Sequence, residues 1–169
     1  SPSGKIAVGA WYYTEKSDDL LAVDSNGNPV RENNQGMYII GEHQLYAEEG
    51  SKDQGLAGFV RLGFADKNVN QFDYAWSAGV VYTGLIPSRD EGRLGFGING
   101  AHNSNKFKES SLAGGTAMDN AETALELTYS DNITNWLSVQ PDVQYIINPG
   151  TDKTLDNALV IGSRFTVKF

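Results

Sequence analysis

The sequence predicts an all-β fold, an antiparallel sheet of the kind that closes into a transmembrane β-barrel. About eight segments, each of roughly 8–12 residues, are rich in aromatic and β-branched residues. Several of them alternate apolar and polar side chains at period two, as a strand with two different faces does. The segments between them are rich in Gly, Asn, Asp, Ser and Pro, the residues that turns select.

The predicted strands differ in the length of the connections that follow them. Connections 14–36 and 103–121, which follow the first and fifth strands, are long and are expected to be loops. Connections after even-numbered strands are short. Outer-membrane barrels have longer external loops and short periplasmic turns, so both long loops lie outside if the chain ends in the periplasm. In chain order, the predicted strands are residues 6–13, 37–47, 56–65, 74–83, 93–102, 122–129, 137–148 and 158–169.

One segment, residues 117–129, also fits a helix. Met118, Ala121 and Leu125 are spaced for one helical face, and several neighbours are good helix formers. A strand is favoured because apolar residues at 125, 127 and 129 alternate with polar residues at 126 and 128.

The cost of charge in lipid assigns the two faces of the sheet. An Arg or Lys on the lipid side of a barrel midplane costs about 2–4 kcal/mol, so Arg61 and Arg164 are expected to face the lumen. In strand 37–47, Glu42 and Gln44 would share that face with Tyr38 and Tyr46; in strand 6–13 the two faces are too alike to assign. The residues predicted to face lipid are Val60, Leu62, Phe64, Trp76, Val80, Tyr82, Leu94, Phe96 and Ile98.

Composition excludes several classes of function. The chain has 169 residues, a formal charge of -8 and no Cys. An acidic chain is a poor partner for nucleic acid, and without Cys there is neither a disulfide scaffold nor a thiolate metal site. No serine occupies a nucleophile elbow, and no cofactor motif stands in its required context. The residues give no indication of an enzyme.

The C-terminal stretch carries the most specific pattern. It contains Glu122-x-x-x-Glu126-x-x-Tyr129, then Trp136-Leu-x-x-Gln-Pro-Asp-x-Gln-Tyr-x-x-Asn-Pro-Gly150, and ends in Phe169. This pattern resembles the C-terminus of the OprB-type carbohydrate-selective porins. The resemblance is strongest over about the last 50 residues, and the earlier chain shares the rhythm of strands and turns more than any motif.

The resemblance implies a porin of the bacterial outer membrane that lets small sugars such as glucose diffuse passively. Family members are longer and close a barrel of about sixteen strands, within the range of outer-membrane barrels. Residues 1–169 would then be the C-terminal part of one barrel domain. The expected partners are sugars, outer-membrane lipid and the remaining N-terminal strands of the same porin, with no nucleic acid and no cofactor.

A sugar passage needs polar side chains that exchange hydrogen bonds with hydroxyl groups and release them again. Arg supplies a rigid set of donors, carboxylates accept, and Gln does both. The alternative for each residue is a charge pair that stiffens the barrel wall. The candidate sugar-binding residues are Arg61, Arg93, Arg164, Glu42, Glu126, Gln140, Asp142 and Gln144.

Two short motifs are set aside. Gly95-x-Gly97-x-x-Gly100 lies within a predicted strand and leads into no helix, which a dinucleotide site requires. Asp24-x-Asn26-x-Asn28 begins like a calcium loop, but Pro29 stands where glycine is required. Loose calcium binding there remains an alternative. No metal site is expected.

Three other functions remain open from the sequence. Eight strands could close by themselves into a small barrel filled by side chains, acting as a structural anchor or adhesin without a pore. The many glycines on the lumenal side count against that reading, because they fill a core poorly. A soluble all-β binding module and a barrel-embedded enzyme are the others.

Overall fold

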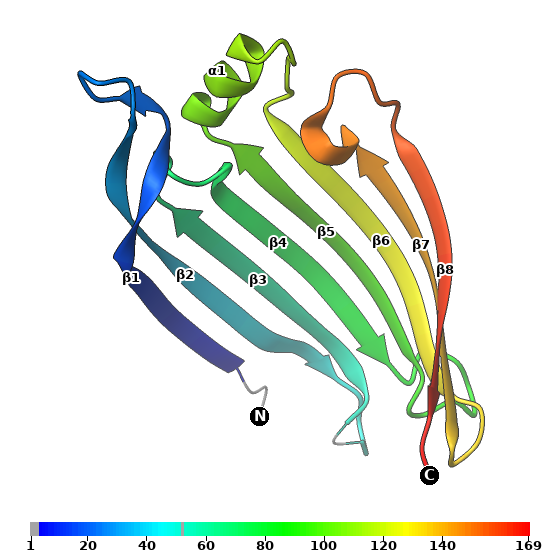
Figure 1. Ribbon diagram of the computed structural model, residues 1–169. Coiled ribbons are helices and arrows are strands. Elements are labelled where there is room, and N and C mark those ends of the chain that lie inside the picture. The colour runs from blue at the N-terminus through cyan, green and yellow to red at the C-terminus, as the bar shows by residue number, and fades with distance from the viewer. Residues whose placement is uncertain (1–3, 52) are drawn as a thin grey trace.

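The computed structural model describes residues 4–51 and 53–169, which form one antiparallel sheet (Figure 1). Neighbours in the sheet follow chain order from β1 to β8. Every predicted strand is present, so the all-β antiparallel fold is confirmed. The strands are β1 Gly4–Val23, β2 Pro29–Ala47, β3 Gly55–Ala65, β4 Phe72–Thr83, β5 Arg93–Asn103, β6 Ala121–Asn132, β7 Leu137–Ile147 and β8 Ala158–Val167.

The expectation that residues 14–36 form a loop is wrong. β1 and β2 continue as a long hairpin, with the turn at residues 24–28. This part of the hairpin has polar residues on both faces, so it lacks the apolar alternation that marks a strand. It is held by cross-strand polar contacts: Arg31 Nε lies 3.4 Å from Asp18 Oδ1, and Asn33 Nδ2 donates to the Tyr13 carbonyl at 3.3 Å.

The second long connection, also expected as a loop, contains helix α1, Asn105–Ala113. Ser104 caps its N-terminus, because the Ser104 hydroxyl accepts the Phe107 N–H at 3.2 Å. The helix has no buried residue and no pronounced apolar stripe, which explains why periodicity did not reveal it. The alternative helix over 117–129 is absent: this segment runs into β6, and the preferred strand is confirmed.

The two connections expected to be long lie at the same end of the sheet, as predicted. The β1–β2 turn, α1 and the 3₁₀ turn η1 (Pro149–Thr151) lie at one end, and the C-terminus lies at the other (Figure 1). We call the first end the mouth. The turns at the opposite end include residues 84–92 and 133–136, and the first of these is longer than the β1–β2 turn at 24–28.

Strand register confirms that the residues predicted to face lipid share one face. Val60 pairs with Ala78, which pairs with Ile98, and Val80 pairs with Phe96. Tyr46 is a correction. A bulge between Gln44 and Tyr46 moves Tyr46 to the apolar face, where its ring centroid lies 6.5 Å from that of Tyr82.

Register also settles β1, which the sequence left unassigned. Lys5 pairs with Glu42 and shares its face, so Ile6 and Val8 lie on the apolar face, where their side chains are exposed.

Among the described residues, no apolar side chain is buried. A single curved sheet has no second layer to cover its apolar face, so residues such as Ile161 and Phe165 are largely exposed. The buried side chains are polar and lie near the ends of the strands: Asp19, Asn103, Ser104, Asp131 and Thr151. No helix within residues 4–51 and 53–169 is long and apolar enough to cross a membrane.

Candidate functional site

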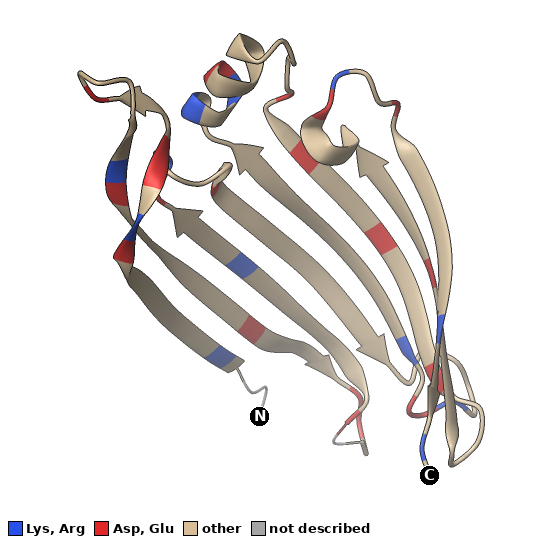
Figure 2. Cartoon of the chain, in the orientation of Figure 1, with Lys and Arg blue, Asp and Glu red and all other residues tan. Residues whose placement is uncertain are grey.

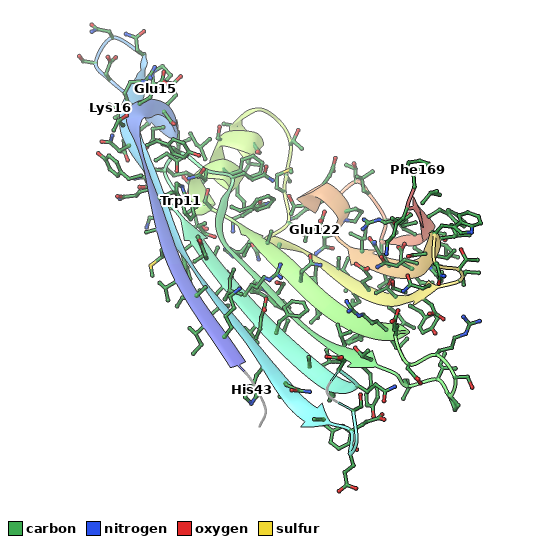
Figure 3. All side chains as sticks on the ribbon, turned by 90° about the horizontal axis from the view of Figure 1, so that it is seen from below. Trp11, Glu15, Lys16, His43, Glu122 and Phe169 are labelled. Atoms are coloured by element: carbon green, nitrogen blue, oxygen red, sulfur yellow. The ribbon has the colours of Figure 1, made fainter. Side chains whose placement is uncertain are left out.

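All eight predicted sugar-binding residues lie on the polar face of the sheet. Glu42 pairs with Phe59, Arg61 pairs with Ser77, and Glu126 pairs with Gln144, so register places these side chains on one side of neighbouring strands. Trp11 and Glu122 share this face, and they lie on the concave side of the sheet, whereas His43 points away from it (Figure 3). The polar face is therefore the inner face of the curve.

The inner face holds a first polar group on β2 and β3. Arg61 Nη2 lies 4.0 Å from Glu42 Oε1, and both side chains are about half exposed. The Arg61 guanidinium carbon lies 5.1 Å from the centroid of the Phe59 ring, within the range of a cation–π contact. This group presents five guanidinium donors and one carboxylate to the concave space.

A second polar group lies on β6, β7 and β8. Gln144 Nε2 donates to Asp142 Oδ2 at 3.2 Å, and Gln140 Nε2 donates to Thr128 Oγ1 at 3.1 Å. Arg164 is the register partner of Gln140 on the neighbouring strand. A Cβ added at Gly162 would lie 2.8 Å from Asp142 Oδ1, so only a glycine at this position leaves space for the Asp142 carboxylate. With Glu126, these residues alternate donors and acceptors along the wall.

The two polar groups are separated by a glycine-rich floor. Gly79 pairs with Gly97 across β4 and β5, and β3 and β6 are three strand spacings apart, about 14 Å. A depression of about 190 Å³ lies over this floor, and Phe59, Asn99, Glu126 and Thr128 are among its lining residues. The sequence predicted the face of each residue but not this separation into two groups.

Arg93 stands apart from both groups, near the end opposite the mouth. It lines a pocket there with Asp53, Asp90 and Glu91. Nearby, the half-exposed Arg89 places Nη1 3.2 Å from Asp131 Oδ2, and the Tyr129 hydroxyl donates to the same oxygen at 3.2 Å. These contacts fix the turn between β4 and β5 against β6.

At the mouth, α1 lies inside the curve of the sheet (Figure 3). Lys106 of α1 donates a hydrogen bond to the buried Asp19 carboxylate of β1, which also accepts the N–H groups of Leu21 and Ala22 at 2.9 and 2.7 Å. The sequence did not indicate this contact, because Asp19 and Lys106 each look like a solvated loop charge. Their pairing depends on how two distant connections pack.

The Asp24 carboxylate, considered above as part of a calcium loop, accepts hydrogen bonds from backbone N–H groups of the β1–β2 turn. Its Oδ1 accepts the N–H groups of Asn28 at 2.9 Å and of Asn26 at 2.8 Å. These hydrogen bonds, that of Asn28 first, lower the pKa of Asp24 below its ordinary value. Within the described part of the chain, no group of three or more His, Asp or Glu residues could hold a metal ion.

Charge is distributed unevenly over the sheet. Isolated charged residues mark the strands, and charged residues are denser on the β1–β2 hairpin and in several connections (Figure 2). His102 has its Nδ1 2.8 Å from Asp73 Oδ1 and its ring stacked 4.5 Å from that of Tyr74. That group lies at the mouth end of the apolar face.

Comparison with known proteins gives the same architecture. The family described as "Carbohydrate-selective porin, OprB family" matches residues 2–169. Porin B of Pseudomonas aeruginosa is 30% identical over 188 residues, covering 98% of this chain and 41% of that protein.

Two solved structures of Pseudomonas putida OprB are also similar. The structure at high pH has a TM-score of 0.88 and 30% identity, covering 98% of this chain and 44% of that one. The structure at low pH has a TM-score of 0.61 and 25% identity, covering 98% and 47%. This chain spans less than half the length of each of these relatives.

Proposed function

Because the chain belongs to the carbohydrate-selective porin family, OprB, of the Gram-negative outer membrane, we propose that it forms part of the wall of a channel for passive diffusion of small sugars. The observation that carries the proposal is the division of one curved sheet into a polar concave face and an apolar convex face. A water-filled barrel in lipid requires this division.

The rest of the wall would come from further strands of the same porin. β1 and β8 are the two edges of the sheet, and an unpaired strand edge is unfavourable in hydrocarbon, where no water can satisfy its backbone groups. We infer that these edges pair with strands outside this chain. The open order of the sheet counts against a self-contained eight-stranded anchor.

Sugar recognition would use the two polar groups on the inner face. Arg61 and Arg164 would donate to sugar hydroxyls, while Glu42, Glu126 and Asp142 would accept from them. Gln140 and Gln144 can do both. The side chains of Glu42, Arg61 and Arg164 are well exposed, so each can exchange a water molecule for a hydroxyl group at low cost. Arg93 would act near the opposite end of the channel.

Single-channel conductance of the complete porin in planar bilayers tests the proposal. Titration with glucose should reduce the current saturably, and a larger disaccharide should give a different half-blocking concentration. Arg61→Ala and Arg164→Ala should each raise the half-blocking glucose concentration about fivefold, because one net hydrogen bond contributes about 1 kcal/mol.

Arg31→Ala, which alters an exposed ion pair at the mouth, is the matched control and should leave the half-blocking concentration unchanged. Open channels whose current does not respond to any sugar would contradict sugar selectivity. Well-inserted protein without channels would contradict the pore itself.

A further inference from the structure

We propose that Phe59 is a positioning residue, which holds the Arg61 guanidinium over the inner face and depends on Gly79 to do so. This inference rests on the proposed function above. Phe59 and Arg61 are two residues apart on β3, so both side chains leave the same face of the strand. The Arg61 guanidinium carbon lies 5.1 Å from the centroid of the Phe59 ring.

Gly79 provides the room for the Phe59 ring. It is the register partner of Phe59 on β4, and a Cβ placed there would lie 2.7 Å from Cε1 and 2.9 Å from Cζ of the ring, and 2.9 Å from the Phe96 carbonyl oxygen on β5. Real Cβ atoms do not approach a ring so closely, so any side chain at 79 would displace Phe59. Glycine within a strand often marks such a close approach. The ring therefore lies across the backbone of the neighbouring strand.

The ring is needed because Arg61 has little else to fix it. Its ion-pair partner Glu42 is 4.0 Å away, and the two side chains are 56% and 46% exposed. Such exposed ion pairs contribute little, and a free arginine side chain samples many rotamers. A flat aromatic face beneath the guanidinium restricts those rotamers while leaving the N–H donors free for a ligand.

The position of Arg61 matters for binding because Gly97 leaves open space on the inner face beside Phe59, where a ligand could reach the Arg61 donors. A Cβ at Gly97 would meet only the Ala78 carbonyl, at 3.8 Å. The depression over Gly97 has Phe59, with Arg61 above it, on one side and Glu126 on the other. Glu126 lines the depression as an acceptor, and Arg61, held over the lining residue Phe59, supplies donors beside it, an arrangement suited to a neutral, polyhydroxylated ring.

The test is a double-mutant cycle, measured as the half-blocking glucose concentration of the complete porin. Phe59→Leu and Gly79→Ala should each raise that concentration about two- to fivefold, the change that an exposed cation–π contact represents. Phe59→Tyr keeps the aromatic face and should retain wild-type blocking. In the Arg61→Ala background, Phe59→Leu should have no further effect. An equal effect of Phe59→Leu with and without Arg61 would overturn the positioning role and make the ring itself the sugar contact.

Gly63→Ala is the matched control for Gly79→Ala. It adds the same methyl group to the same face, where the nearest atom, the Ala75 carbonyl oxygen, is 4.0 Å away. This variant should block like the wild type, and an equal effect of both alanines would contradict the specific role of Gly79.

A second readout does not depend on sugar binding. The NMR order parameter of the Arg61 Nε–H in the complete porin should fall in Phe59→Leu and Gly79→Ala and stay unchanged in Gly63→Ala. If the wild-type current does not respond to glucose, the proposed function fails while this measurement still tests the positioning. An order parameter unchanged by Phe59→Leu would overturn it.

Discussion

The strands between the mouth and the opposite end of the sheet form a region that we call the wall. The wall and the mouth are stabilised in opposite ways. On the wall, large apolar side chains such as Phe96 and Leu127 are about half exposed, and none in the described residues is buried. At the mouth, the buried side chains are polar, and Asn103, Ser104 and Thr151 have no exposed surface at all. The outer face of an outer-membrane barrel meets lipid, so apolar groups can stay uncovered there, whereas connections that lie in water must be held together by their own contacts.

The mouth does so by a hydrogen-bond network that joins three connections, those between β3 and β4, β5 and β6, and β7 and β8. Asn103 Nδ2 donates to the Asp119 carbonyl at 2.9 Å and to Thr151 Oγ1 at 2.7 Å, and Gln71 Nε2 donates to Asn103 Oδ1 at 3.2 Å. Ser104 Oγ donates to the Asn70 carbonyl at 3.0 Å. No buried side-chain polar atom in the described residues lacks a partner. Burial is tolerated there because every group is satisfied.

The largest expected effect comes from placing a charge on the wall. Phe96 lies on the apolar face between Val80 and Leu127, near the middle of β5. Phe96→Arg should destabilise the folded barrel by about 2–4 kcal/mol, because the guanidinium would enter hydrocarbon near the midplane. Urea titration of the complete porin in lipid vesicles measures this loss. Asn99→Arg, on the inner face of the same strand, should refold normally, and an equal loss in both would show that the faces are assigned incorrectly.

A smaller, local effect is expected from cutting the mouth network. Asn103→Ala removes two donated hydrogen bonds and leaves buried partners unsatisfied, at a cost of about 1–3 kcal/mol. Amide hydrogen exchange should accelerate in residues 105–120 and 149–152, while the strands of the wall keep their protection. Asn120→Ala, which removes only the exposed acceptor of Lys108 Nζ, is the control. Faster exchange throughout the wall would show that the two regions are not independent.

The same contrast explains how much the sequence could predict. The strands of the wall carry a local signal, because one face is apolar and the other polar, as in an outer-membrane barrel, and period-two alternation follows directly. Three features were therefore predictable: the eight strands, the end of the sheet at which the long connections lie, and the faces of Arg61 and Arg164. Tyr46 was assigned to the wrong face because a single bulged residue inverts the alternation without leaving a signal in the composition.

The mouth carries no such local signal. Residues 14–23 and 29–36 carry polar residues on both faces, so the β1–β2 hairpin resembles a loop in sequence. Asn103, Ser104 and Thr151 are polar residues near turns, and only the packing of connections far apart in the chain buries them. The candidate site was predictable only in part, less than the wall and more than the mouth. The face of each residue followed from alternation, but the proximity of Phe59 to Gly79 depends on the register of two strands.

The smallest expected effect is an acid-sensitive turn at the mouth. The Asn28 and Asn26 N–H groups that bind the Asp24 carboxylate lower its pKa below the ordinary value of 3.8. A carboxyl group with a lowered folded pKa stabilises the turn fully above its unfolded pKa, and this contribution is lost as the pH falls through the folded pKa. The turn should therefore be intact at neutral pH and loosen only below about pH 4. The pH titration of the Asn28 amide proton by NMR measures this transition.

Asp24→Asn keeps a side-chain oxygen that does not titrate, so the transition should disappear in that variant. A transition that persists would have to be assigned to another titrating group. The amides of the β4–β5 ladder, far from Asp24, should not report it, because their hydrogen bonds join backbone groups that do not ionise.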